Sequence, residues 1–215
     1  MHILVTGSKG FIGRNLTAHL KATTEDTVLG FDVDNTPNDL SAALAVADVV
    51  IHLAGVNRPR TEAEFYSGNA GLTETLCETL LSLGRAVPIM LSSSIQAELE
   101  NPYGLSKRQA EEVLRRYAQQ SGAGVVIYRL PNVFGKWCRP NYNSVVATFC
   151  HAIARDLPIT ISDPAREMQL VHVDDVVEAL VSEVRRQKSE VRGGTVYREV
   201  GPVYRVTLGR LAELI

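Results

Sequence analysis

Two side chains in the segment NPYGLSK, Tyr103 and Lys107, have the types and spacing needed for proton transfer. Residues four apart on a helix share one face, so both would point to the same place. A free phenol has a pKa of about 10 and is a poor acid or base at neutral pH. A neighbouring ammonium favours the phenolate, lowers that pKa and makes Tyr103 a usable proton donor or acceptor. Ser94, in the preceding segment LSSSIQ, can hydrogen-bond the same carbonyl or alkoxide oxygen.

A glycine-rich turn near the N-terminus could supply a cofactor for this chemistry. Gly7, Gly10 and Gly13 in TGSKGFIGRNL follow the apolar run Ile3–Val5 and precede a helix-like segment. Glycines allow a tight turn and close backbone approach, and a helix N-terminus offers free N–H groups to a pyrophosphate. The spacing alone also fits an ordinary strand–helix turn. Its place after the first strand favours dinucleotide binding, and a positive nicotinamide would favour the Tyr103 phenolate further.

The elements that must position these residues alternate along the first 130 residues. We expect strands at 2–6, 27–31, 48–55, 87–93 and 124–129, and helices at 11–22, 40–47, 69–83 and 105–120. Such alternation predicts an α/β fold, with parallel strands and helices on both faces. We therefore expect residues 1–130 to form the dinucleotide-binding core, a doubly wound Rossmann-like sheet.

The character of the chain changes after Leu130. Residues 130–143 are rich in Pro, Asn, Gly and aromatics, which is typical of a long ordered binding loop. We expect helices at 144–155 and 174–186, strands at 158–161 and 169–173, and a last helix from 208. Residues 131–215 are predicted to be a small C-terminal substrate-binding region, interleaved with the last core elements. Because the chain stops within a helix, we expect the natural protein to continue.

The composition excludes several classes of partner. Of the 215 residues, 45% are hydrophobic and 21% charged, and the net charge of -2 comes without a basic block, so nucleic acid is not expected. No apolar run approaches the roughly 18 residues of a membrane span. No signal peptide is visible, which predicts a cytoplasmic protein. Cys77, Cys138 and Cys150 lack metal-ligand spacing, and no metal is expected.

The chain resembles the extended short-chain dehydrogenase/reductase family along its whole length. The resemblance lies in TGSKGFIG, HLAG, LSSS, YGLSK, YRLPNVFG and VHVDDVVEAL. It implies hydride transfer at a sugar carbon, with Tyr103 as acid and base, Lys107 binding the nicotinamide ribose and Ser94 polarising the reacting oxygen. A homodimer is also expected. The implied coenzyme-binding residues are Gly7, Lys9, Gly10, Phe11, Ile12, Gly13, Asp32, Leu53, Ala54, Gly55, Asn69, Tyr103, Lys107 and Leu130.

The residues after Ser94 narrow the reaction. Nucleotide-sugar dehydratases of this family carry Asp-Glu there, because elimination of water needs an acid and a base. Ile95 and Gln96 can serve as neither, which argues against dehydration. Ketone reduction and 4-epimerisation remain. A non-catalytic NAD(P)-binding sensor is the third reading, although such relatives usually lack the Tyr or the Lys.

A longer segment, FGKWCRPNYNSVVATFCHAIA, favours reduction. With HLAGVNRP and LSSSIQA it resembles the capsule and O-antigen enzymes that reduce the 4-keto group of a UDP-linked 6-deoxy-hexosamine on the way to UDP-N-acetyl-L-fucosamine. A C-terminal cupin domain follows the reductase domain in that group. Met168 stands where the wider family often has a diphosphate-binding Arg, and Arg166 is offset by two. The expected UDP-sugar ligands are Ser94, Asn132, Lys136, Arg139 and Arg166.

Two residues give opposing signals on coenzyme choice. Asp32 ends the second predicted strand, where a carboxylate binds the adenosine ribose and repels a 2′-phosphate, favouring NAD(H). Lys9 precedes Gly10, where a basic side chain reaches a 2′-phosphate in related nucleotide-sugar reductases. The resemblance to the fucosamine-pathway reductases also implies NADP(H). We therefore expect both coenzymes to bind, with NADP(H) slightly ahead and NAD(H) as the alternative.

Overall fold

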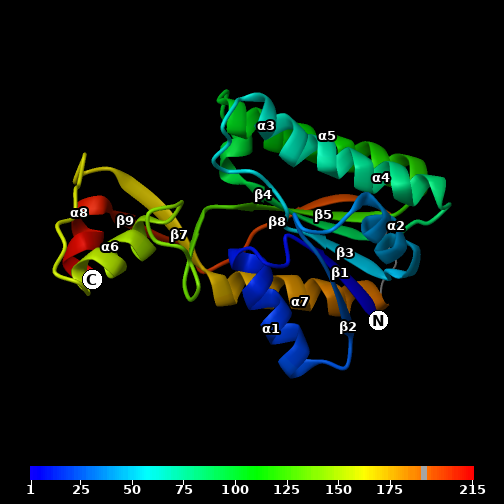
Figure 1. The fold of residues 1–215 in the computed structure, drawn as a ribbon, viewed down its shortest axis with the longest axis horizontal. Coiled ribbons are helices and arrows are strands. Elements are labelled where there is room, and N and C mark those ends of the chain that lie inside the picture. The colour runs from blue at the N-terminus through cyan, green and yellow to red at the C-terminus, as the bar shows by residue number, and fades with distance from the viewer. Residues whose placement is uncertain (190–192) are drawn as a thin grey trace.

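A parallel sheet of six strands forms the centre of the computed structural model, which describes residues 1–189 and 193–215 (Figure 1). The strand order is β2-β1-β3-β4-β5-β8, and every neighbouring pair is parallel. The strands are β1 (His2–Thr6), β2 (Thr27–Phe31), β3 (Val49–His52), β4 (Ile89–Ser94), β5 (Gly124–Leu130) and β8 (Gly194–Arg198). The predicted α/β class with a parallel, doubly wound sheet is confirmed.

The direction of winding reverses between β1 and β3. The chain adds β2 on one side of β1 and then crosses back to add β3 on the other side. Ligands of doubly wound folds bind beyond the carboxyl ends of the strands at this switch point. The glycine turn after β1 and the segment HLAG at the end of β3 therefore border the same crevice.

Helices cover both faces of the sheet (Figure 1). On one face lie α2 (Pro37–Val46), α4 (Leu72–Ser82) and α5 (Pro102–Ser121); on the other lie α1 (Phe11–Thr23) and α7 (Val173–Ser189). Successive strand side chains point to opposite faces. Leu4 accordingly packs in the core shared with α4 and α5, whereas Ile3 and Val5 pack in the core shared with α1 and α7.

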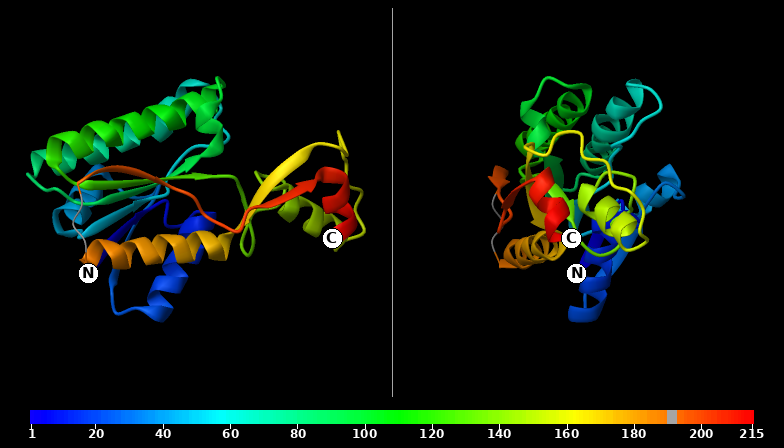
Figure 2. Two further views of the ribbon diagram at one scale, coloured as in Figure 1. Left: turned by 180° about the vertical axis from the view of Figure 1, so that it is seen from behind. Right: turned by 90° about the vertical axis from the view of Figure 1, so that its left-hand side faces the viewer.

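A smaller C-terminal lobe projects beyond one end of the sheet (Figure 2). In it β7 (Glu167–His172) pairs in parallel with β6 (Asn132–Phe134) and antiparallel with β9 (Tyr204–Thr207). Two helices, α6 (Val145–Ile153) and α8 (Leu208–Leu214), pack beside these strands. Phe149, Leu170 and Leu211 form the buried centre of this lobe.

Four details differ from the elements expected from the sequence. The predicted strand at 158–161 is wrong, because Ile159 and Ile161 pack against the lobe's apolar cluster without pairing to a strand. The strands β8 and β9 were not expected, and β6 lies inside the predicted loop at 130–143. The predicted helix at 69–83 becomes a regular α-helix only from Leu72, after a π-helical segment at Tyr66–Gly71.

Candidate active site

The glycine turn between β1 and α1 is packed so closely that two of its glycines admit no side chain. Gly7 has φ +68°, and a Cβ there would lie 2.7 Å from the backbone nitrogen of Ala54. A Cβ on Gly13 would lie 2.1 Å from the carbonyl oxygen of Gly7. Gly10 is different: its φ is −70°, and its Cβ would lie 3.1 Å from that oxygen, its single close contact. Gly7 and Gly13 therefore shape the turn, whereas Gly10 presents its open side outward.

The start of α1 keeps its backbone donors available. Gly10 occupies the N-cap position and no side chain caps this helix. Free N–H groups and the positive end of the helix dipole favour an anion such as a pyrophosphate. The turn therefore fits the dinucleotide that the sequence implies. By contrast, side chains cap the N-termini of α2, α5, α6 and α8, namely Thr36, Asn101, Ser144 and Thr207.

The start of α5 brings Tyr103 and Lys107 to the carboxyl end of β4. Asn101 caps the helix and Pro102 occupies its first turn, so the predicted helical spacing of the pair is confirmed. Lys107 is only 6% exposed, and its Nζ donates a hydrogen bond of 2.9 Å to the carbonyl oxygen of Ser92. The ring of Phe65 lies 5.7 Å from the ring of Tyr103, centroid to centroid, and shields it from one side.

The environment sets the protonation of both groups. Burial raises the pKa of the Tyr103 phenol, and a hydrogen bond with Ser94 opposes that increase. Burial also lowers the pKa of the Lys107 ammonium to about 8, and the Glu111 carboxylate opposes that decrease. The expected lowering of the Tyr103 pKa is therefore not found, because desolvation by burial outweighs the opposing hydrogen bond with Ser94.

Three consecutive serines at the end of β4 make three different contacts. The carbonyl oxygen of Ser92 accepts from Lys107, and the Ser94 hydroxyl lies beside Tyr103 and accepts from the backbone N–H of Gln96 at 3.1 Å. The Ser93 hydroxyl donates to Glu111 at 2.5 Å. The sequence predicts a role for Ser94 alone. Glu111 was not expected at the site, and the signal that could have found it is its position one helical turn beyond Lys107.

The loop after β3 lies against the same lysine. A Cβ on Gly55 would lie 3.6 Å from the Lys107 Nζ and 2.7 Å from the Asn69 Oδ1. Asn69 itself is buried, accepts from the backbone N–H of Val56 at 3.0 Å and donates to Ser106 at 2.9 Å. Its amide thus holds the loop to α5, and its expected contact with the coenzyme stays a prediction.

The remaining residues expected to bind the coenzyme lie around the same crevice. Leu53 and Ala54 begin the loop after β3, and the backbone N–H of Ala54 donates to the Thr6 hydroxyl at 3.2 Å. Leu130 is buried at the end of β5, next to Ser94 in the sheet register. Phe11 and Ile12 open α1 and are half-buried.

Asp32 and Lys9 are both engaged in hydrogen bonds within the protein. The Asp32 carboxylate accepts from the backbone N–H groups of Lys9 at 2.7 Å and of Val33 at 2.9 Å. It therefore braces the glycine turn against the end of β2. The Lys9 ammonium forms an exposed ion pair with Asp34. Lys9 must leave Asp34 before it can reach a phosphate.

The residues expected to bind the substrate lie farther apart than those expected to bind the coenzyme. The amide of Asn132 donates to the carbonyl of Gln169 at 3.4 Å, Lys136 pairs with Asp174 at 3.0 Å, and Arg139 stacks on a tyrosine. Arg166 is exposed in the turn before β7, and within the described residues its side chain makes no hydrogen bond or ion pair. Met168, at the position where the wider family often has an Arg, packs against the apolar cluster of the lobe.

One contact ties the loop after β3 to the loop after β6. Arg58 donates from Nε to the Asn143 side chain at 2.9 Å, and its guanidinium lies 5.2 Å from the centre of the Tyr142 ring. Arg139 approaches the same ring at 5.6 Å. Two cations from different loops thus meet on one ring, and neither contact was expected from the sequence.

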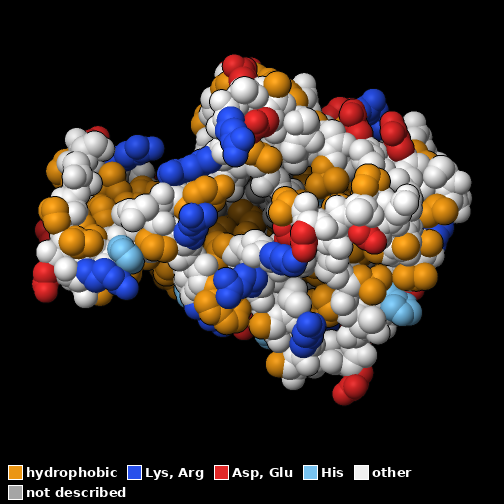
Figure 3. Space-filling view, viewed as in Figure 1, with side chains coloured by type: hydrophobic (Ala, Val, Ile, Leu, Met, Phe, Trp, Pro, Cys, Tyr) orange, Lys and Arg blue, Asp and Glu red, His pale blue; other side chains and the backbone are white. Residues whose placement is uncertain are grey.

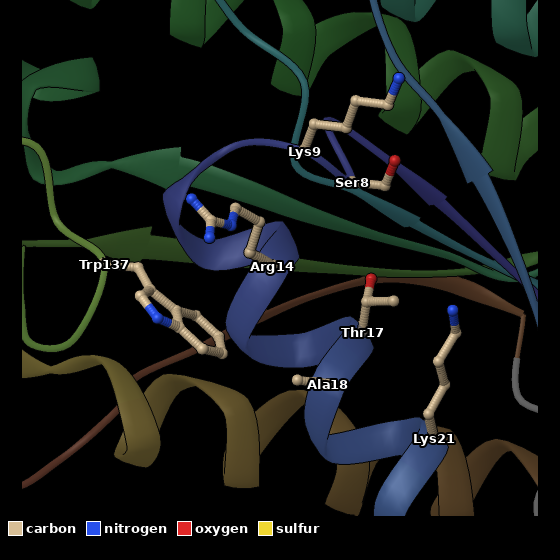
Figure 4. Close-up of a pocket in the computed structure, with 7 residues that line it drawn as sticks. All are labelled: Ser8, Lys9, Arg14, Thr17, Ala18, Lys21 and Trp137. Carbon is tan, nitrogen blue, oxygen red and sulfur yellow. The ribbon is translucent and has the colours of Figure 1, made fainter.

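Lys and Arg side chains surround a hollow between the core and the lobe (Figure 3). A separate open cavity of about 580 Å³ lies along the outer side of α1 (Figure 4). There Arg14 stacks on Trp137 at 5.2 Å, and Lys9 points away from both. This cavity contains none of Ser94, Tyr103 and Lys107, so it is not the reaction site. Its lining residues are Ser8, Lys9, Arg14, Thr17, Ala18, Lys21 and Trp137.

Neither a metal centre nor a membrane-spanning helix is found in the part of the chain that the structure describes. No three His, Cys, Asp or Glu side chains cluster as metal ligands there. No helix in residues 1–189 and 193–215 is both long and apolar enough to cross a membrane.

The parallel sheet, the glycine turn and the Ser–Tyr–Lys group define a dinucleotide-dependent enzyme of the α/β class. Comparison with known families gives the same class. Residues 3–197 match the model of the NAD dependent epimerase/dehydratase family, and the chain belongs to that family. Nicotinamide dinucleotides are thus its coenzymes. The resemblance to the extended short-chain dehydrogenase/reductase family that the sequence showed is therefore confirmed.

Particular relatives are closer to the expected subgroup. The chain is 48% identical over 213 residues to a UDP-2-acetamido-2,6-beta-L-arabino-hexul-4-ose reductase of Pseudomonas aeruginosa. The matched region covers 99% of this chain and 56% of that protein. It is also similar to the crystal structure of the capsular polysaccharide assembling protein CapF from Staphylococcus aureus. That similarity has a TM-score of 0.85 and 42% identity, and covers 100% of this chain and 56% of that one.

A more distant structure shares the fold. The UDP-glucuronic acid 4-epimerase of Bacillus cereus in complex with NAD is 21% identical, with a TM-score of 0.83 over 98% of this chain and 81% of that one. The chain thus spans little more than half the length of its two closer relatives and most of the length of this one.

Proposed function

We propose that this chain reduces the 4-keto group of a UDP-linked 6-deoxy-hexosamine with a nicotinamide dinucleotide. The observation that carries the proposal is the Ser94, Tyr103 and Lys107 group beside an uncapped glycine turn. The relative that is 48% identical is named as a reductase of such a sugar. Ile95 and Gln96, both exposed, follow Ser94 and supply neither the acid nor the base that dehydration needs.

The reaction assigns one task to each residue. The bound coenzyme supplies the hydride that converts the ketone into an alcohol. Ser94 and Tyr103 hold the carbonyl oxygen by hydrogen bonds, and Tyr103 gives its proton to that oxygen as the hydroxyl forms. Reduction needs a protonated phenol, and burial keeps the proton on Tyr103 by raising its pKa. Lys107 binds the nicotinamide ribose with its ammonium.

A single assay separates this function from its alternatives. The purified chain is mixed with a UDP-linked 4-keto-6-deoxy-hexosamine and NADPH or NADH, and the loss of absorbance at the nicotinamide band is followed with the sugar product. Stoichiometric oxidation of the coenzyme is expected. A 4-epimerase, the alternative that the shared fold allows, interconverts sugars without net oxidation and retains its coenzyme through purification. A non-catalytic sensor binds the coenzyme and turns over nothing.

The UDP part of the substrate is assigned to the start of β6, the loop after β6 and the turn before β7. Asn132, Lys136, Arg139 and Arg166 supply amide and cationic groups for a uridine diphosphate, and Lys136 would exchange its Asp174 partner for it. We also retain the prediction of a homodimer, which sedimentation of the purified chain tests. A cytoplasmic location is a separate prediction. The nicotinamide coenzymes are expected to bind with NADP(H) slightly preferred over NAD(H).

Substitutions of Asp32 and Lys9 are expected to shift the coenzyme preference in opposite directions. Asp32→Ala removes a carboxylate that repels a 2′-phosphate and is expected to raise the NADPH-to-NADH ratio of kcat/KM. Lys9→Ala removes the cation and is expected to lower that ratio. Two unit charges about 4 Å apart interact by roughly 4 kcal/mol near a protein surface, enough to move the ratio measurably.

The ion pair of Lys9 offers a matched control for this prediction. Asp34→Asn releases the Lys9 ammonium without touching Asp32 or the glycine turn, and it is expected to raise the ratio. If none of the three variants moves the ratio, neither residue selects the coenzyme. Arg14, stacked on Trp137 at the edge of the turn, is then the next residue to test.

A further inference from the structure

A buried carboxylate that the proposed reaction does not use lies one helical turn from Lys107. The side chain of Glu111 is only 2% exposed, and the whole of Lys107 only 6%. Residues four apart on a helix lie about 5–6 Å apart at Cβ, so the two charges face the same interior space. A buried carboxylate is costly unless it is paired and hydrogen-bonded.

Four hydrogen bonds converge on this carboxylate from three strands. The Ser93 hydroxyl of β4 donates to its Oε1 at 2.5 Å. Arg129 of β5 donates from Nε at 3.0 Å and from Nη2 at 2.6 Å, and the Tyr197 phenol of β8 donates at 3.1 Å. The Arg129 guanidinium also lies 4.9 Å from the centre of the Tyr197 ring. Glu111 thus fastens α5 to neighbouring strands of the sheet.

The contact with Ser93 reaches the reacting groups on both sides. Ser93 lies between Ser92, whose carbonyl accepts from Lys107, and Ser94, whose hydroxyl contacts Tyr103. Fixing Ser93 therefore fixes the two atoms of β4 that orient the lysine and the tyrosine. If Glu111 served only as a structural ion pair, its contact with Arg129 would be sufficient. The contact to the middle serine is what connects the network to the reaction site.

The charges around Lys107 show why the carboxylate matters. The titratable groups that interact electrostatically with it are Glu111 on its own helix and His52 on β3, and Tyr103 lies one helical turn before it on α5. His52 lies between Thr6 and Thr73 and is neutral, because burial lowers its pKa to about 3. Arg129 is a second cation on the far side of Glu111. Arg129 has a second partner in the exposed Glu98, at 3.1 Å, so loss of the Glu111 carboxylate would leave Lys107 as the cation without an opposite charge.

We propose that Glu111 is a positioning residue of this site, which fixes the end of β4 through Ser93 and supplies the buried counter-charge that keeps Lys107 an ammonium. This proposal rests on the assignment of Lys107 to the coenzyme ribose. Because the Lys107 pKa is about 8, coenzyme affinity falls as pH rises through that value. Without the Glu111 charge, the ammonium is lost at a lower pH.

The test is coenzyme binding by calorimetry between pH 6 and pH 9.5, without substrate. In Glu111→Gln we expect the midpoint of the alkaline loss of affinity to move to lower pH by about one unit, the lower end of the effect of an opposite charge at this range. Affinity at pH 6 is expected to stay close to that of the native protein. Ser93→Ala and Tyr197→Phe each remove one hydrogen bond to Glu111 without changing charge, and both are expected to leave the midpoint in place.

A purely structural role gives a different pattern. If Glu111→Gln weakens binding equally at every pH with an unmoved midpoint, the counter-charge role is wrong. Glu111→Asp keeps the charge and replaces the Gln variant in the test if that variant does not fold. A midpoint of the alkaline loss of affinity at the native pH supports the proposal, and a midpoint at a lower pH overturns it. A native protein that binds coenzyme with no pH dependence in this range overturns both the Lys107 assignment and this proposal. A protein that binds coenzyme normally but reduces no sugar affects only the proposed reaction.

Discussion

Replacing Tyr103 with phenylalanine is expected to reduce the rate of sugar reduction by at least about 100-fold, the usual effect of losing a general acid. The phenol is the group with a proton available beside Ser94, and its ring would remain packed against Phe65. Coenzyme affinity is therefore expected to stay near the native value. Single-turnover measurements with saturating coenzyme, together with calorimetry, separate the two quantities.

The same helix provides a matched control. Tyr117 of α5 is also buried, and its phenol donates to the carbonyl of Val87 at 2.8 Å, far from the serine triplet. Tyr117→Phe also removes a phenol oxygen from α5. It is expected to lower the free energy of unfolding by about 1 kcal/mol and to leave the rate of sugar reduction unchanged. Equal rates in the Tyr103 variant and the native protein would remove Tyr103 from the mechanism.

The parts of the site that could be predicted are those set by short stretches of chain. The glycine turn is fixed by one strand, one turn and one helix, and the Tyr103–Lys107 pair is fixed by the repeat of a single helix. Ser94 joins them because the strand that it ends leads almost directly into α5. None of these contacts depends on the order of the strands in the sheet.

The parts that were missed depend on that order. Glu111 meets Tyr197 because β8 adds to β5 at the sheet edge, and β8 has exposed side chains whose pattern gave no sign of a strand. Lys9 meets Asp34 because β2 pairs with β1. The sequence therefore presented Lys9 and Asp32 as competing signals on coenzyme choice. In the folded protein Asp32 is also a brace of the glycine turn.

The second large effect is expected at Gly10, where valine should abolish dinucleotide binding while the fold survives. The backbone conformation of Gly10 is one that valine can adopt, and its Cβ would meet only the carbonyl oxygen of Gly7, at 3.1 Å. The added side chain would instead occupy the approach to the uncapped start of α1, where the pyrophosphate needs close backbone contact. Calorimetry with NADPH and NADH measures the loss, and circular dichroism with thermal unfolding checks the fold.

Two further substitutions show whether such a loss is specific. Ala18→Val adds comparable bulk on the exposed outer side of α1 and is expected to bind coenzyme normally. Gly13→Ala places a Cβ 2.1 Å from the Gly7 oxygen, so it is expected to damage the fold itself. Gly10 is thus the position where binding can be removed without losing the turn. Native affinity in a folded Gly10→Val protein would disprove the phosphate-binding role of the turn, because no dinucleotide could approach the helix past that side chain.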